Sequence, residues 1–197
     1  MSSRADTATT RDAMLDAARE LIAEIGYESM SHADITATVG IGRTTFYEHF
    51  ASKEDLLVEL VRRDLPPRSR ELLDLVDPGL PAIERLRQLA FEMVRYVGTD
   101  HIGLILHTEV PRLSPKAQRD IAEAHAGLAR EFATIYREGV EAGSFRKFSP
   151  QLAGRMMEGI IMMGGKVVMD TADPSKHAEQ IARETADMLV AALRPET

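Results

Sequence analysis

Apolar residues recur along the chain at intervals of three and four, the spacing that puts side chains on one face of an α-helix. Alternating runs rich in β-branched residues are absent, and proline and glycine fall between the periodic segments. The pattern predicts an all-α fold of about nine helices. They are expected at residues 11–25, twice within 31–50, at 52–65 with a continuation past Pro66-Pro67 left open, and at 81–97, 101–110, 114–142, 149–170 and 173–193.

The last three expected helices share one start signal, a capping residue followed by proline at the first helical position. The pairs are Ser114-Pro115, Ser149-Pro150 and Asp173-Pro174. The side-chain oxygen of the cap can accept a hydrogen bond from a free first-turn amide, and proline loses no hydrogen bond at that position. We therefore expect helices to begin at all three pairs.

The segment from Ser31 to Phe50 has the pattern of a helix-turn-helix. Ser31 followed by Asp34 fits a shortened capping box, so a short helix is expected to start there. Gly40-Ile41-Gly42 then provides a three-residue turn, in which glycine supplies the backbone freedom. A second short helix is expected directly after it.

The second short helix is predicted to separate a buried face from an outer face. At about 100° per residue, Phe46 and Phe50 share one side and are expected to be buried. Small hydroxyls and a carboxylate point the other way, flanked by two longer polar side chains. The outward residues are Thr44, Thr45 and Glu48, with Tyr47 and His49 on either side of them. This layout is typical of a helix that reads a DNA groove.

The net charge disfavours a protein that binds nucleic acid over its whole surface. The net charge is -7 at pH 7, whereas phosphate binding is supplied by lysine and arginine. Within residues 31–53 the charges of Asp34, Arg43, Glu48 and Lys53 sum to zero. DNA binding would therefore depend on where the side chains are placed, and on two copies of the motif acting together.

Residues 35–56, ITATVGIGRTTFYEHFASKEDL, resemble the signature of the tetracycline-repressor (TetR) family of transcriptional regulators. The resemblance implies groove contacts by Thr44 and Thr45, phosphate contacts by Tyr47, His49 and Lys53, and backbone contacts near the start of the first motif helix. The full set of candidate DNA-binding residues is His32, Ala33, Arg43, Thr44, Thr45, Tyr47, His49 and Lys53. Gly42 departs from the family pattern, which usually has a capping serine there, so the second helix is expected to lack a side-chain cap.

The C-terminal part is predicted to dimerise and to bind a small-molecule effector. The helix at 149–170 is apolar nearly all round, and together with the helix at 173–193 it would form a four-helix interface in a homodimer. Gly159, Gly164 and Gly165 would permit close helix approach. Periodicity does not separate a pocket wall from a core. The candidate effector-binding residues are Phe91, Met93, His107, Glu109, Tyr136, Met157 and Met162.

Several kinds of chemistry have no support in the sequence. There is no cysteine, the histidines lack metal-ligand spacing, and no arrangement indicates a nucleophile with its base, so we expect no cofactor, no metal and no enzymatic activity. The run from Gly159 to Lys166 resembles a phosphate-binding loop, but the lysine is one residue late and Val167 replaces the magnesium-binding hydroxyl. With neither a signal peptide nor a membrane-spanning run in the sequence, we expect a cytoplasmic location.

Two functional hypotheses follow. The first is a ligand-responsive repressor with a DNA-binding domain at 1–51 and a ligand-binding and dimerisation domain at 52–197, whose partners are a double-stranded DNA operator, a small-molecule effector and a second copy of the chain. The alternative is a helical protein-interaction module that keeps the helix-turn-helix as a scaffold, which the neutral motif and acidic surface favour. An all-α enzyme ranks third.

Overall fold

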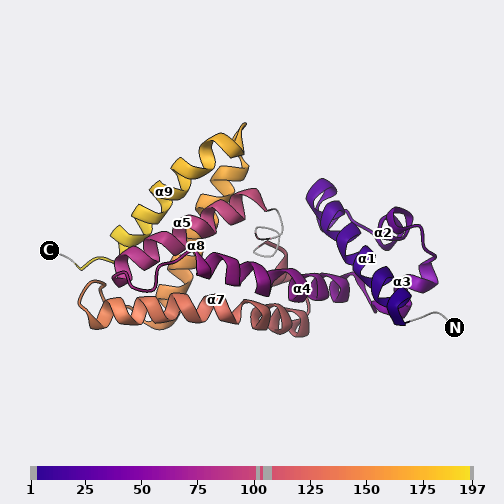
Figure 1. Cartoon of the computed structure of the whole chain (residues 1–197), viewed down its shortest axis with the longest axis horizontal. Coiled ribbons are helices and arrows are strands. Elements are labelled where there is room, and N and C mark those ends of the chain that lie inside the picture. The colour runs from indigo at the N-terminus through magenta and orange to yellow at the C-terminus, as the bar shows by residue number, and fades with distance from the viewer. Residues whose placement is uncertain (1–3, 101–102, 104–107, 196–197) are drawn as a thin grey trace. The chain divides into compact units, whose positions relative to one another are not determined.

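The computed structural model describes residues 4–100, 103 and 108–195. Over these residues the chain forms eight α-helices, one 3-10 helix and no strand (Figure 1). The elements are α1 (Arg4–Ile25), α2 (His32–Val39), α3 (Arg43–His49), α4 (Lys53–Asp74), α5 (Ala82–Thr99), η1 (Val110–Arg112), α7 (Pro115–Glu141), α8 (Pro150–Met169) and α9 (Pro174–Leu193). The predicted all-α class is confirmed.

Three helix boundaries differ from the expectation or complete it. Helix α1 begins at Arg4 instead of residue 11, because its polar first turns carry no apolar stripe that periodicity could detect. Helix α4 continues through Pro66-Pro67 to Asp74. The helix expected at 101–110 lies mostly outside the described residues, which show only residues 103, 108 and 109 as helical before η1.

The three cap-and-proline signals all start helices. Ser149 accepts a hydrogen bond from the amide of Leu152 at 3.3 Å, and Asp173 accepts one from Lys176 at 3.2 Å. The Ser114 hydroxyl accepts the amide of Ala117 at 3.3 Å. A local signal of two residues thus determined where α7, α8 and α9 begin.

The chain divides into two compact units. The described residues within 1–65 and 105–124 belong to the first unit, and those within 66–104 and 125–197 belong to the second. Helices α4 and α7 therefore each supply residues to both units. The expected domain boundary between residues 51 and 52 stays a prediction.

In the first unit, α1, α2, α3 and the start of α4 enclose a small apolar core. Fully buried side chains include Met14, Leu15, Ile35, Phe46, Phe50 and Leu56. Ion pairs join α1 to α4 outside this core: Arg11 to Glu59, Arg19 to Asp64 at 3.2 Å, and Asp16 to Arg63 at 2.8 Å. These long-range pairs hold the first helix against the fourth.

In the second unit, α5 packs on both α8 and α9, which also pack on each other (Figure 1). A Cβ added at Gly165 would lie 2.4 Å from Val97 Cγ1, and one at Gly164 would lie 2.5 Å from Thr185 Oγ1. These two glycines therefore permit the close approach that was expected of them. Gly159 is exposed and has no neighbour within 4 Å of such a Cβ in the single chain, so for this glycine the expectation stays a prediction.

No helix in residues 4–100, 103 and 108–195 combines the length and the apolar content needed to cross a membrane.

Candidate nucleic-acid interface

The start of α2 is held by a complete capping box. The Ser31 amide donates to Asp34 Oδ2 at 2.8 Å, while the Ser31 hydroxyl accepts from the Asp34 amide at 3.3 Å. The Ser31 hydroxyl also donates to the same carboxylate at 2.7 Å, and these hydrogen bonds lower the pKa of Asp34 below its ordinary value. The shortened capping box predicted from Ser31 and Asp34 is confirmed.

The turn between α2 and α3 depends on a left-handed glycine. Gly40 has φ of 74° and donates its amide to the Thr36 carbonyl at 2.9 Å, and the Ile41 amide shares that carbonyl at 3.0 Å. A side chain at this φ would be strained, which explains the glycine. Gly42 precedes α3 and supplies no side-chain cap, as the departure from the family pattern implied.

Helix α3 presents the faces that the sequence predicted. Phe46 and Phe50 are buried, with ring centroids 5.8 Å apart. Thr44 and Glu48 are exposed, and Tyr47 is 43% exposed. The Arg43 guanidinium lies 5.6 Å from the centroid of the Tyr47 ring, so these two candidate residues form one outward pair.

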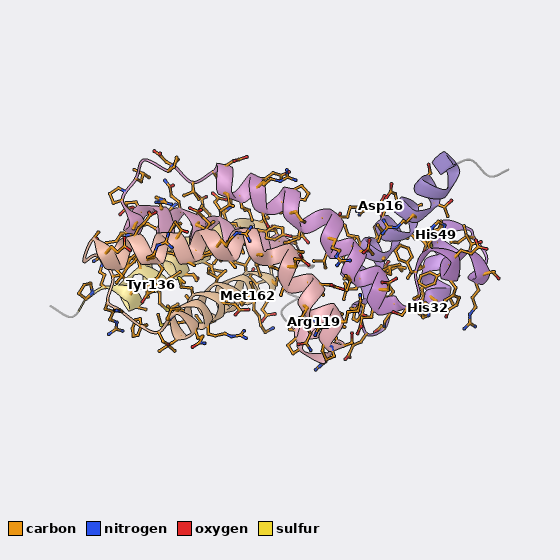
Figure 2. The ribbon with its side chains drawn as sticks, turned by 90° about the horizontal axis from the view of Figure 1, so that it is seen from below. Asp16, His32, His49, Arg119, Tyr136 and Met162 are labelled. Carbon is orange, nitrogen blue, oxygen red and sulfur yellow. The ribbon has the colours of Figure 1, made fainter. Side chains whose placement is uncertain are left out.

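His32, on α2, lies against two rings of α3. Its ring centroid is 4.7 Å from that of Phe46 in an edge-on arrangement and 5.4 Å from that of Tyr47. Burial lowers the pKa of His32 below its ordinary value, and the positive charges of Arg43 and Lys53 lower it further. The lowered pKa favours the neutral form of the ring, and His32 and His49 belong to the same helix-turn-helix (Figure 2).

Lys53, at the start of α4, has a role that the sequence did not indicate. Its ammonium donates to the carbonyls of Tyr27, Glu28 and Met30 at 2.9, 3.2 and 3.0 Å. It also lies 4.5 Å from the centroid of the Tyr27 ring. The lysine thus holds the connection between α1 and α2, across 23 to 26 residues of chain that no local pattern links.

All eight candidate DNA-binding residues lie in the first unit. Ala33, Arg43, Thr44 and Tyr47 are exposed, whereas His32, Thr45, His49 and Lys53 are half-buried. The structure brings them onto α2, α3 and the first turn of α4. Their roles in DNA contact stay predictions.

The start of α7 is joined to the same unit through Glu54. The Ser114 amide donates to Glu54 Oε2 at 2.9 Å, and the Ser114 hydroxyl donates to the other carboxylate oxygen. Arg112 of η1 pairs with Glu28 at 2.8 Å. Buried Tyr27 adjoins this cluster: burial, followed by the charges of Glu54 and Glu109, raises its pKa to about 12. Neighbouring residues Lys53 and Glu54 therefore hold two different segments.

The predicted effector-binding residues occupy different environments in the described residues, and their role in effector binding stays a prediction. Met93 and Met157 are buried in the core of the second unit, and the Tyr136 hydroxyl accepts the Phe148 amide at 2.7 Å and donates to the Arg146 carbonyl at 3.1 Å. Figure 2 labels Tyr136 and Met162, which lie on different helices. Phe91 is half-buried, Glu109 belongs to the first unit, and His107 lies outside the described residues.

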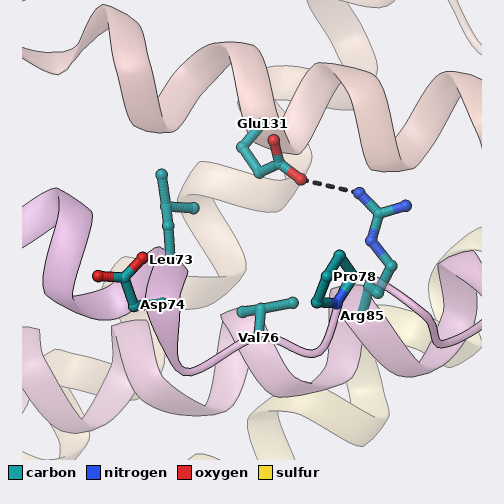
Figure 3. A pocket seen from close by; sticks show the side chains of 6 residues that line it. All are labelled: Leu73, Asp74, Val76, Pro78, Arg85 and Glu131. Atoms are coloured by element: carbon teal, nitrogen blue, oxygen red, sulfur yellow. Dashed lines mark hydrogen bonds and ion pairs between the residues drawn. The ribbon is translucent and has the colours of Figure 1, made fainter.

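A hollow of about 290 Å³ lies elsewhere in the second unit (Figure 3). Its lining is Leu73, Asp74, Val76, Pro78, Arg85 and Glu131. Arg85 pairs with Glu131 at 2.8 Å and with Glu138 at 2.5 Å, so its charge is already balanced. None of the predicted effector residues lines this hollow, whose walls come from the end of α4, the connection that follows it, and polar residues of α5 and α7.

Two family models match the chain. One is described as bacterial regulatory proteins, tetR family, and matches residues 14–60; the other is the tetracyclin repressor-like C-terminal domain, at residues 79–163. The transcriptional repressor KstR2 of Mycolicibacterium smegmatis is 31% identical over 144 residues, which are 71% of this chain and 69% of the relative. The fatty acid metabolism regulator protein of Bacillus subtilis is 25% identical over 150 residues, 75% of this chain and 77% of that protein.

Solved structures share the fold. The regulator FadR from Bacillus subtilis in complex with stearoyl-CoA aligns with a TM-score of 0.75 and 23% identity, covering 93% of this chain and 99% of that one. AibR in complex with isovaleryl coenzyme A and operator DNA aligns with a TM-score of 0.73 and 22% identity, covering 95% and 100%. At these identities the likeness concerns the fold.

Proposed function

The chain belongs to the tetR family of bacterial regulatory proteins and is a ligand-responsive DNA-binding repressor; we propose that it acts as a homodimer on a palindromic operator and is released by an acyl-CoA thioester. The observation that carries the DNA-binding part is the division of α3. Two buried phenylalanines anchor the helix, and its outer face offers Thr44, Tyr47 and the Arg43 guanidinium. A recognition helix needs this arrangement.

Dimerisation through α8 and α9 is part of the proposal. On α8, Leu152, Met163 and Val167 are 53%, 48% and 47% exposed and lie on one face of the helix. Met188 of α9 is 43% exposed. Large apolar side chains gathered on two adjacent helices favour burial against a second copy, and a dimer also supplies the two half-sites that compensate for the neutral motif.

An acyl-CoA is proposed as the effector because two proteins of the same fold are described as bound to stearoyl-CoA and isovaleryl-CoA. Helix α8 also carries Met156, Met157 and Met162, whose flexible thioethers can rearrange around an acyl chain. The hollow of about 290 Å³ is at the lower end of small-molecule pockets, and no residue of α8 lines it, so we propose that effector binding is accompanied by rearrangement of the helices. A ligand that binds the moved arrangement better shifts the dimer toward it.

The test begins with selection of bound fragments from a random DNA pool by the full chain, followed by sizing of the free protein and of its complex. We expect enriched sites with two-fold symmetry, bound by a dimer. Stearoyl-CoA and isovaleryl-CoA are then titrated into the complex, with free coenzyme A and stearate as controls, and release is followed by fluorescence anisotropy. Enriched sites without symmetry would contradict the dimer, and release by neither thioester would contradict the effector.

The alternative that the sequence left open, a helical protein-interaction module, rested on the charges within residues 31–53, which sum to zero. A selection that enriches no sequence would favour it. Absence of enzymatic activity and a cytoplasmic location also belong to the proposal, because a regulator acts by binding DNA inside the cell.

A further inference from the structure

We propose that Lys53 is a positioning residue that holds the α1–α2 connection, and with it the start of α2, and that it does not contact a DNA phosphate. The inference rests on the proposed DNA binding and concerns how that interface is built. It departs from what the resemblance implies for this lysine. The three hydrogen bonds from its ammonium to the connection carry the argument.

The ammonium of Lys53 has no donor left over. A lysine carries three N–H donors, and here three carbonyl oxygens, those of Tyr27, Glu28 and Met30, lie within 3.2 Å of Nζ. To reach a phosphate, the side chain would have to leave at least one of these acceptors. The Tyr27 ring, 4.5 Å from the charge, adds a further attraction that favours the present position.

The carbonyls of Tyr27, Glu28 and Met30 accept hydrogen bonds from Lys53 and from no backbone amide of the described residues. They lie in the connection between α1 and α2. Carbonyl oxygens that converge on one point repel one another through their partial negative charges, and a cation between them relieves this repulsion. Lys53 supplies that cation from the first turn of α4, where the helix dipole by itself disfavours positive charge.

The held segment leads directly into the candidate interface. Met30 is followed by Ser31, the cap of α2, and then by His32 and Ala33, two of the predicted DNA-contacting residues. Fixing the carbonyl of Met30 therefore fixes where α2 begins. Since α2 packs on α3, the lysine also determines how the recognition helix is supported.

The test uses two variants of the full chain, Lys53→Met and Lys53→Arg. Methionine keeps the apolar stem and removes the charge, whereas arginine keeps the charge but has a planar fork that does not fit three carbonyls converging on one point. Amide exchange is measured without DNA over residues 27–35, and affinity for the selected operator is measured across a series of salt concentrations. We expect faster exchange in both variants. We also expect about tenfold weaker binding in both, the size of one lost charge-assisted hydrogen bond.

The salt dependence separates the two roles. Loss of one phosphate contact lowers the slope of log affinity against log salt by about 0.9. We expect the slope of Lys53→Met to equal that of the wild type, while Arg43→Met, at an outward candidate residue, serves as the control that lowers it. A fall in the Lys53→Met slope, wild-type affinity in Lys53→Arg, or unchanged exchange in both variants would each overturn the proposal. Circular dichroism confirms that the variants fold.

Failure of this inference is distinguishable from failure of the proposed function. If the wild-type chain enriches no operator, the DNA-binding proposal fails, yet amide exchange still reports on the lysine because it requires no DNA. If the operator is enriched and bound but exchange over residues 27–35 is unchanged, only the positioning role fails.

Discussion

The helix-turn-helix and the core of the second unit are stabilised in different ways. Around α2 and α3, side chains hold backbone: Ser31 and Asp34 cap a helix, and Lys53 holds three carbonyls. In the second unit, α5, α8 and α9 are held by apolar contact, and glycines let their backbones approach. The polar contacts require particular donor and acceptor side chains, whereas the apolar contacts require side chains whose shapes fit between the packed helices.

This difference explains why the outward face of α3 could be predicted from the sequence, whereas the environments of the candidate effector residues could not. The outward residues of α3 follow from helix geometry once Phe46 and Phe50 are known to be buried. No comparable rule identifies the residues that line a pocket, because methionine and tyrosine side chains are as common in a hydrophobic core as in a pocket wall. Met93, Tyr136 and Met157 are buried and engaged in packing or hydrogen bonds.

The largest expected effect is on the close-packed helices. Gly165→Ala would place its Cβ 2.4 Å from Val97 Cγ1, so α5 and α8 must separate. We expect the free energy of unfolding to fall by about 2–3 kcal/mol, measured by urea denaturation. Gly154→Ala on the same helix is the control: nothing lies within 4 Å of its Cβ, and we expect a gain of up to about 1 kcal/mol from helix propensity. Equal stability of the two variants would refute close packing at Gly165.

The second effect is on DNA binding. Tyr47→Ala removes an exposed ring from the outer face of α3, and we expect affinity for the selected operator to fall about tenfold with little change in the unfolding midpoint. Tyr47→Phe removes only the hydroxyl, and it separates a phosphate hydrogen bond from contact through the ring. Wild-type affinity in Tyr47→Ala at moderate salt would contradict the assignment of this face.

A smaller effect is expected where α7 joins the first unit. Glu54→Gln weakens the acceptor for the Ser114 amide and hydroxyl, at a cost of about 1 kcal/mol in the free energy of unfolding. Amide exchange over residues 109–117 should become faster. In a double-mutant cycle with Ser114→Ala, the two changes should be less than additive, and strict additivity would show that the contact contributes nothing.

The smallest effect concerns pH. Because the pKa of His32 is lowered in the folded protein, the unfolded chain binds the extra proton more readily as the pH falls. Stability from this group is complete above about pH 6.5 and is lost as the pH falls toward the lowered value. The ring is partly exposed, so we expect His32→Gln to change the difference in melting temperature between pH 7.5 and pH 5.5 by only about 1–2 °C. An identical difference in both proteins would argue against the shift.

The helices themselves were largely predictable. Apolar spacing, together with the helix-turn-helix pattern, predicted a helix at each of the eight described α-helices but not the 3-10 helix η1. Cap-and-proline pairs located the starts of α7, α8 and α9. Helix ends were less certain where the chain is polar, as at the beginning of α1, because helicity there leaves no apolar stripe. The passage of α4 through Pro66-Pro67 could only be left open, since two prolines remove amides without always ending a helix.

By itself the sequence determined the helical class, the helix-turn-helix and the outer face of α3, since each follows from residue spacing within about twenty positions. Only the tertiary structure decided what Lys53 and Glu54 hold, because their partners are 23 to 26 and 60 residues away. It also decided which glycines lie at helix crossings and which candidate pocket residues belong to the core. Contacts between distant segments depend on how the helices pack, and no local pattern encodes them.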